Sequence, residues 1–201
     1  MSADADADDS LRLFIAVPCV ASRGLRRVIA ALEELRPGVK PVDPEALHLT
    51  LRFLGPTPRR RVTVLGEALR RAVDAARVGP IEVRWATLGR FPTGQRKPAR
   101  VIFAAPADPS PIERLAAAVS AQLEALDPPV PAEERPFSAH LTLARVKPAR
   151  RGGDPTRAVE RLCERHAATD LGGGRIEAVQ LLASTLTPRG PVYEVQRAVQ
   201  L

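Results

Sequence analysis

The tetrapeptide His-Leu-Thr-Leu (HLTL) occurs twice in this chain, at residues 48–51 and again at 140–143. Each copy lies within a longer alternation of apolar and polar residues, LHLTLRFLG at 47–55 and AHLTLARV at 139–146. Alternation of this kind predicts a β-strand with one face buried in the core. Given a second histidine, finding Leu-Thr-Leu after it by chance is on the order of one in a thousand from ordinary residue usage. The two strands therefore indicate an internal duplication.

Other segments repeat in the same order. RLFIAVP at 12–18 corresponds to RVIFAAP at 100–106, and IEV at 81–83 corresponds to IEA at 176–178. The spacing between copies is about 90 residues, which is too long for a solenoid repeat. We predict a duplicated strand–helix–strand–helix–strand unit and an α+β fold. Its two lobes would be related by a pseudo-two-fold axis, with mixed or antiparallel sheets facing a central cleft and helices outside.

The expected domain organisation follows from this repeat. Residues 1–10 are predicted to be a disordered acidic tail, and 11–201 a single bilobal domain with half-repeats at about 11–88 and 100–201. The linker between the lobes would fall near 89–99. Hydrophobic periodicity predicts strands at 11–17, 47–55, 81–88, 100–105, 139–146, 175–184 and 192–199, and helices at 22–36, 58–77, 109–126 and a last one ending near 168.

Composition excludes several classes of protein. With 201 residues, 45% of them hydrophobic, the chain is not wholly disordered. Two cysteines, Cys19 and Cys163, exclude a disulfide-dense scaffold and a four-cysteine zinc site. No apolar run approaches the roughly 18 residues of a membrane span, and the acidic opening does not resemble an export signal. We therefore expect a cytoplasmic protein with no membrane association and, because the duplication supplies two half-sites, a monomer.

The two HLTL strands carry the candidate catalytic residues. Residues i and i+2 of a strand share one face, so His48 and Thr50 point one way, and His140 and Thr142 do the same in the other copy. If a two-fold axis relates the strands, two imidazoles and two hydroxyls converge. One neutral imidazole can then take a proton from an attacking oxygen while an imidazolium protonates a leaving oxygen. The hydroxyls would donate hydrogen bonds to phosphate oxygens, which suits phosphoryl chemistry.

Arginine supplies most of the positive charge behind the formal net charge of +7. Its planar fork matches phosphate oxygens in pairs, so an arginine-rich body suits a phosphate ligand or a nucleic acid. Arg145, five residues after His140, is the candidate for neutralising a phosphate. Strand parity places Arg145 on the face opposite His140, so a bulge or the end of the strand must turn it inward.

A metal site is the weaker interpretation of the histidines. His48 and His140 are one ligand short of the usual catalytic zinc set. The third histidine, His166, lies late in a predicted helix beside Glu164 and Arg165, which is typical of a surface or helix-end residue. We therefore expect neither a metal ion nor a cofactor.

Taken together, these segments resemble the bacterial and archaeal RNA 2′,3′-cyclic phosphodiesterases, also called 2′–5′ RNA ligases, of the two-histidine phosphoesterase superfamily. The resemblance runs from about residue 12 to 201, and the paired HxTx motifs in this order are its most specific feature. The segments that carry it are RLFIAVP (12–18), HLTLRFLG (48–55), LGRFP (88–92), RPFSAHLTLAR (135–145) and STLTPRGPVYEV (184–195).

The resemblance implies metal-independent hydrolysis of a terminal 2′,3′-cyclic phosphate to a 2′-phosphate, with a weak reverse 2′–5′ ligation. By family usage His48 would be the proton donor to the leaving 3′-oxygen and His140 the proton acceptor acting on water, although the residues alone show no asymmetry that fixes these roles. Thr50, Thr142 and Arg145 match the family's phosphate-contacting positions. One departure is Ala139, where the family usually has proline before the second histidine.

Two alternatives stay open from the sequence. The first is a non-catalytic RNA-binding module, which the arginines favour but the shortage of aromatic stacking residues opposes. The second keeps the fold and acts on small cyclic nucleotides or on 2′–5′ linkages, so the expected partner is RNA with a 2′,3′-cyclic phosphate end or a small cyclic nucleotide. The plausible base-stacking residues are Phe53, Trp85, Phe91, Phe137 and Tyr193.

Overall fold

Two antiparallel β-sheets form the centre of the molecule. The computed structural model describes residues 9–94, 97–147, 155–188 and 190–201. The four-stranded sheet contains, in order, β3 (His48–Pro58), β1 (Ser10–Pro18), β8 (Ala178–Thr187) and β9 (Gly190–Gln200). The five-stranded sheet contains, in order, β2 (Val39–Pro41), β6 (Leu141–Val146), β5 (Val101–Pro106), β4 (Ile81–Phe91) and β7 (Gly173–Ile176). Each strand pairing described is antiparallel, as in the predicted α+β fold.

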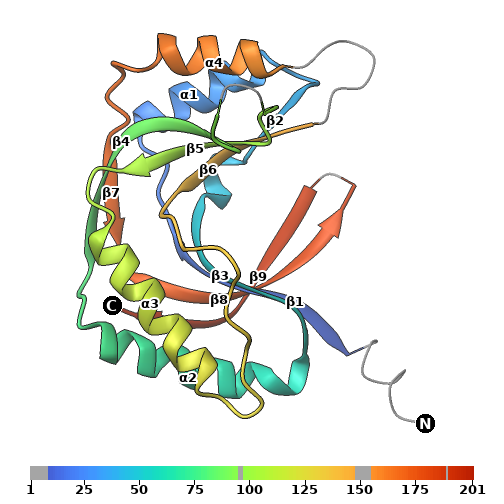
Figure 1. Cartoon of the computed structure of the whole chain (residues 1–201), viewed down its shortest axis with the longest axis vertical. Coiled ribbons are helices and arrows are strands. Elements are labelled where there is room, and N and C mark those ends of the chain that lie inside the picture. The colour runs from blue at the N-terminus through green and yellow to red at the C-terminus, as the bar shows by residue number, and fades with distance from the viewer. Residues whose placement is uncertain (1–8, 95–96, 148–154, 189) are drawn as a thin grey trace.

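Helices cover the outer face of each sheet, and the inner faces look toward each other (Figure 1). The helices α2 (Val62–Ala76) and α3 (Ser110–Glu124) pack on the four-stranded sheet. On the five-stranded sheet lies α1 (Arg23–Glu33), and α4 (Thr156–Arg165) packs against α1. Two short 3₁₀ helices, η1 (Pro44–Ala46) and η2 (Arg59–Arg61), precede β3 and α2. None of the helices in the described stretches is long and apolar enough to cross a bilayer.

Apolar residues on the two faces of the four-stranded sheet belong to two different clusters. Leu49, Leu51, Leu141 and Leu143 are at most 3% exposed and belong to the large apolar core that the helices share. On the four-stranded sheet a second, small cluster contains Phe14, Ala16 and Leu182, with Tyr193 packed against it. Because Phe14 lies between Leu13 and Ile15 of the large core, strand alternation places this small cluster on the inner face.

The predicted linker near 89–99 lies between β4 and β5, which are neighbouring strands of one sheet. β4 continues to Phe91, which pairs with Val101 of β5. The two predicted repeats exchange one strand each. β8 of the second repeat adjoins β3 and β1 of the first, and β4 of the first repeat adjoins β6 and β5 of the second in the same way. In each of these sets of three adjoining strands, two strands come from one predicted repeat and the third comes from the other repeat.

Three further strand predictions need correction. The single strand expected at 175–184 is two strands, since β7 pairs with β4 while β8 pairs with β1 in the other sheet. The apolar alternation continues through the change of sheet, so nothing in the pattern marks it. β2 was missed because three residues are too few for a periodic signal. Ser10 belongs to β1, whereas residues 1–8 of the predicted tail lie outside the described part of the chain.

Candidate active site

His48 opens β3 and lies on the inner face of the four-stranded sheet. Its ring centroid is 5.2 Å from that of Phe14 and 4.9 Å from that of Tyr193, both members of the inner cluster. Thr50 shares this face by strand alternation, while Leu49 and Leu51 are buried on the helix side. The aromatic contacts fix the plane of the imidazole.

His140 directly precedes β6 in the five-stranded sheet and is also held by two aromatic rings. Its ring centroid is 5.0 Å from that of Phe91 and 5.6 Å from that of Phe103, and these two phenyl rings stack at 4.3 Å. Gly89 makes room for this stack, because a Cβ added there would stand 2.5 Å from Phe103 Cζ. A larger residue at 89 would push away the ring that supports His140.

The two imidazoles make the same backbone contact. His48 Nδ1 lies 2.9 Å from the carbonyl oxygen of Ala46, and His140 Nδ1 lies 2.7 Å from that of Ser138. A carbonyl oxygen only accepts hydrogen bonds, so Nδ1 donates in both residues. In the neutral ring this leaves the Nε2 lone pair available, and in the protonated ring an Nε2–H donor. Each histidine is therefore oriented for proton transfer at Nε2.

A β-bulge occurs at the second leucine of both HLTL strands. In β3, Thr50 and Arg52 oppose the adjacent residues Ala16 and Ile15 of β1, which leaves Leu51 as the extra residue. In β6, Thr142 and Ala144 oppose Phe103 and Ile102 of β5, which leaves Leu143 extra. An inserted residue reverses the face of each residue that follows it.

The bulges bring the fifth residue after each histidine onto the inner face. In β6 this residue is Arg145, which is exposed while its neighbours Ala144 and Val146 are buried. Arg145 thus lies on the face of His140 and Thr142, and the parity conflict in the sequence is resolved by the bulge. The matching residue of β3 is Phe53, which is 61% exposed, with its ring centroid 6.3 Å from that of Phe14.

Electrostatic contacts join the two inner faces. β3 and β6 lie in contact, so the two histidine-bearing strands are neighbours across the sheets. Burial lowers the pKa of His48; the hydrogen bond with Ala46 opposes this, and the positive charge of Arg145 lowers the pKa further. Burial raises the pKa of Tyr193, and Arg145 opposes that shift. Arg145 of the five-stranded sheet therefore acts on two residues of the four-stranded sheet.

The remaining polar groups of the site are available to a ligand. Within the described residues, the hydroxyls of Thr50 and Thr142 make no hydrogen bond, and Arg145 has no carboxylate within ion-pair distance. Two hydroxyls, a guanidinium and two oriented imidazoles on facing surfaces can bind an anion and move protons on either side of it. That combination suits the transfer or hydrolysis of a phosphoryl group.

His166 lies apart from this constellation. It is the C-cap residue of α4, and its Nδ1 is 3.2 Å from the hydroxyl oxygen of Thr169, as expected for a helix-end residue. In the described stretches, no three His, Cys, Asp or Glu side chains gather closely enough to hold a metal ion. Of the predicted stacking residues, Trp85 is buried in the core, whereas Phe91 and Tyr193 are the rings that contact the histidines.

Sequence reasoning missed Phe14 and Phe103 as supports for the histidines. Both lie on the inner faces of strands that pair with the histidine-bearing strands: Phe103 opposes Thr142, and Phe14 opposes Phe53. The RLFIAVP and RVIFAAP repeats contain these residues, but continuous apolar runs carry no alternation that separates an inner face from an outer one.

A buried arginine ties β3 to the segment that leads into His140. Arg52 is 5% exposed; it donates a hydrogen bond from Nη1 to Ser120 Oγ at 3.0 Å and one from Nη2 to the carbonyl oxygen of Pro131. Glu133 accepts a hydrogen bond from the Phe53 N–H at 3.1 Å, and its carboxylate lies 3.9 Å from Arg52 Nε. These contacts hold β3, which carries His48, against the segment that precedes His140.

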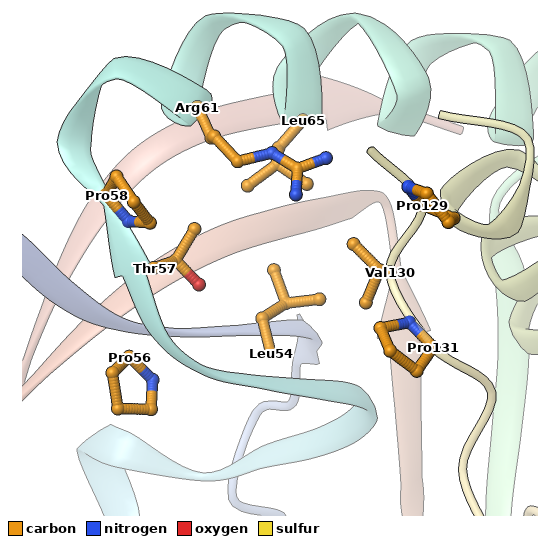
Figure 2. A pocket seen from close by; sticks show the side chains of 9 residues that line it. All are labelled: Leu54, Pro56, Thr57, Pro58, Arg61, Leu65, Pro129, Val130 and Pro131. Atoms are coloured by element: carbon orange, nitrogen blue, oxygen red, sulfur yellow. The ribbon is translucent and has the colours of Figure 1, made fainter. Parts of the chain in front are cut away.

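A hollow lies beside this junction. Figure 2 shows it between the end of β3, η2 and the prolines that follow α3, with the guanidinium of Arg61 above Leu54 and Val130. Its lining includes neither histidine and neither threonine of the site. Arg61 donates a hydrogen bond to the carbonyl oxygen of Pro128, so the hollow belongs to the support of the segment before His140.

Comparison with known proteins finds a family model and relatives that match most of the chain. Residues 22–185 match the family model described as the 2′-5′ RNA ligase superfamily. An RNA 2′,3′-cyclic phosphodiesterase of Archaeoglobus fulgidus is 30% identical over 94% of this chain and 100% of its own length. The Thermus thermophilus protein of the same name is 34% identical over 92% of this chain and 87% of its own length.

Solved structures share the fold. A crystal structure of a Thermus thermophilus protein matches with a TM-score of 0.70 at 31% identity, covering 95% of this chain and 98% of that one. E. coli LigT complexed with 3′-AMP matches with a TM-score of 0.68 at 22% identity, covering 96% and 98%. At the latter identity the likeness shows the fold alone.

The junction at Arg52 yields a stability prediction. Replacing Arg52 with methionine removes two hydrogen bonds and leaves the Pro131 carbonyl without its donor, so we expect the free energy of unfolding to fall by about 1–3 kcal/mol. The matched control Glu133→Gln keeps an oxygen for the Phe53 N–H and should cost less than about 1 kcal/mol. Urea denaturation measures both variants, and equal losses would contradict the importance given to Arg52.

Proposed function

The chain belongs to the 2′-5′ RNA ligase superfamily, and we propose that it hydrolyses RNA 2′,3′-cyclic phosphate ends to 2′-phosphates through His48 and His140. The observation that carries the proposal is the pair of imidazoles with identical Nδ1-to-carbonyl contacts, so that each is prepared for proton transfer at Nε2. The names of the Archaeoglobus and Thermus relatives support the substrate.

In the proposed reaction His140 accepts a proton from water as the water oxygen attacks phosphorus. The bond between phosphorus and the 3′-oxygen breaks, and His48 donates its proton to that oxygen, which leaves a 2′-phosphate and a free 3′-hydroxyl. Each proton transfer typically contributes about 10²–10⁴-fold to the rate. Thr50, Thr142 and Arg145 bind the phosphate oxygens as negative charge develops there. If the 5′-hydroxyl of a second RNA attacks phosphorus in place of water, the same bond to the 3′-oxygen breaks. The two RNAs are then joined by a 2′–5′ linkage.

The low pKa of His48 has to be reconciled with its role as the acid. In the free protein burial and Arg145 favour the neutral imidazole, which cannot donate a proton from Nε2. A bound phosphate brings negative charge beside Arg145 and His48, and an opposite charge raises the pKa of an imidazole. Substrate binding therefore charges the acid in the complex where it is needed.

We also propose that the protein acts without a metal ion, as a monomer and in the cytoplasm. The proton transfers by two histidines and the charge of Arg145 supply the chemistry without a metal ion. One chain contributes both histidine-bearing strands, which supports action as a monomer. Cys19 and Cys163 are free thiols, which supports a location in the reducing cytoplasm.

Removing either imidazole tests the catalytic assignment. We expect His48→Ala and His140→Ala each to lower kcat on RNA with a 2′,3′-cyclic end by at least about 100-fold, because each loses one proton transfer. His166→Ala, at the end of α4, is the matched control and should keep full activity. Rates are measured with and without EDTA, and EDTA should have no effect.

Undiminished turnover in both single variants would sink the two-histidine mechanism. Loss of activity in EDTA would instead point to a metallohydrolase. Unfolding curves of the three variants show whether a lost rate reflects lost chemistry or lost structure.

The electrostatic coupling predicts how His48 titrates. In the free protein its imidazole should titrate below the ordinary value of 6.5, because burial and the like charge of Arg145 both disfavour the protonated form. Arg145→Met removes the neighbouring charge, so the midpoint should move to higher pH. Binding of a 2′-nucleotide should move it the same way in the native protein. Imidazole NMR across pH 4–9 measures both shifts, and an unchanged midpoint in Arg145→Met would refute the coupling.

A further inference from the structure

Lys40 lies beside Arg145 on the inner face of the five-stranded sheet. The register of β2 and β6 sets Lys40 directly opposite Arg145. Residues directly opposite in an antiparallel pair share a face, with Cβ atoms about 4.5–5.5 Å apart. The adjacent pair, Val39 and Val146, is buried in the helix-side core, so Lys40 and Arg145 face the other way. Two cations therefore stand side by side on the surface that carries the site.

The Lys40 ammonium reaches across to the other sheet. A Cβ added at Gly190, the first residue of β9, would stand 3.3 Å from Lys40 Nζ. The ammonium thus lies at the turn between β8 and β9, which belong to the four-stranded sheet. An ammonium carries three N–H donors, so it can bind a ligand and a protein group together.

The order of the strands gives the two cations different positions relative to the histidines. β6 carries Thr142 and Arg145, whereas β2 lies one strand further out, at the edge of the sheet and about 4.8 Å away. Arg145 shares the inner face with His140 and Thr142 and lies near enough to His48 to lower its pKa, so it is placed to bind the phosphate that reacts. Lys40 adds positive charge on the outer side of that position.

A ligand that uses both cations must carry more than one anionic group. A cyclic mononucleotide has a single phosphate, whereas each nucleotide added to an RNA strand contributes another. Resting on the proposed function, we infer that Lys40 binds the phosphate on the 5′ side of the terminal nucleotide. Because a cyclic mononucleotide lacks this second phosphate, Lys40 makes the site prefer an RNA end.

The test compares two substrates in one protein. Values of kcat/KM are measured for 2′,3′-cyclic AMP and for a short RNA that ends in the same cyclic nucleotide. Lys40→Ala should lower the RNA value about tenfold, the effect of losing one hydrogen bond to a charged group, and change the mononucleotide value less than twofold. It should also reduce the salt slope of the RNA value by about 0.7, the contribution of one single-strand phosphate contact.

Two further variants test whether the effect on RNA depends on a positive charge at residue 40 or on the overall positive charge of the protein. Lys40→Arg keeps the cation and should restore most of the RNA value. Arg27→Ala removes an exposed cation from α1 on the helix side and should leave the ratio of the two substrates unchanged.

An equal loss on both substrates would overturn the inference, because Lys40 would then support the hairpin or the reacting phosphate. No loss on either substrate would overturn it as well. Failure of the proposed function looks different, because the native protein would then turn over neither substrate.

Discussion

The β-bulge at the second leucine of each HLTL strand decides which side chains the site contains. Without the extra residue, Arg145 would point into the helix-side core and no cation would stand beside His140 and Thr142. With it, Leu143 and Ala144 are both buried and the guanidinium emerges on the inner face. A bulge thus re-aims a side chain, as bulges near active sites often do. The register of β2 then carries the same face outward to Lys40.

The matching bulge in β3 has a different consequence and makes the site asymmetric. The residue it brings inward is Phe53, an exposed aromatic ring, where the other strand has Arg145. The two imidazoles share their carbonyl contacts, but they differ in their surroundings. His48 is half-buried beside Phe14 and Tyr193 and is subject to the charge of Arg145. This difference between equivalent positions gives the two imidazoles different environments, which the identical HLTL motifs cannot reveal.

Much of the site could be predicted because it depends on local order. Strand alternation places His48 and Thr50 opposite Leu49, and the burial pattern agrees. The duplication predicts a second copy of this strand, and the resemblance names the chemistry. The features that escaped prediction depend on pairing between residues far apart in the sequence. The break between β7 and β8 and the exchange of β4 and β8 between lobes are set by partner strands. The contact between Tyr193 and His48 likewise exists only once β9 joins β8.

The central claim is that two oriented imidazoles cleave the bond between phosphorus and the 3′-oxygen, with His48 protonating that oxygen. The most direct measurement is the position of the phosphate in the product. RNA with a 2′,3′-cyclic end is incubated with the native protein, and the 2′- and 3′-phosphate isomers are separated and quantified. We expect the 2′-phosphate alone. A 3′-phosphate, or a mixture of the two isomers, would show that the leaving oxygen is not the one assigned to His48.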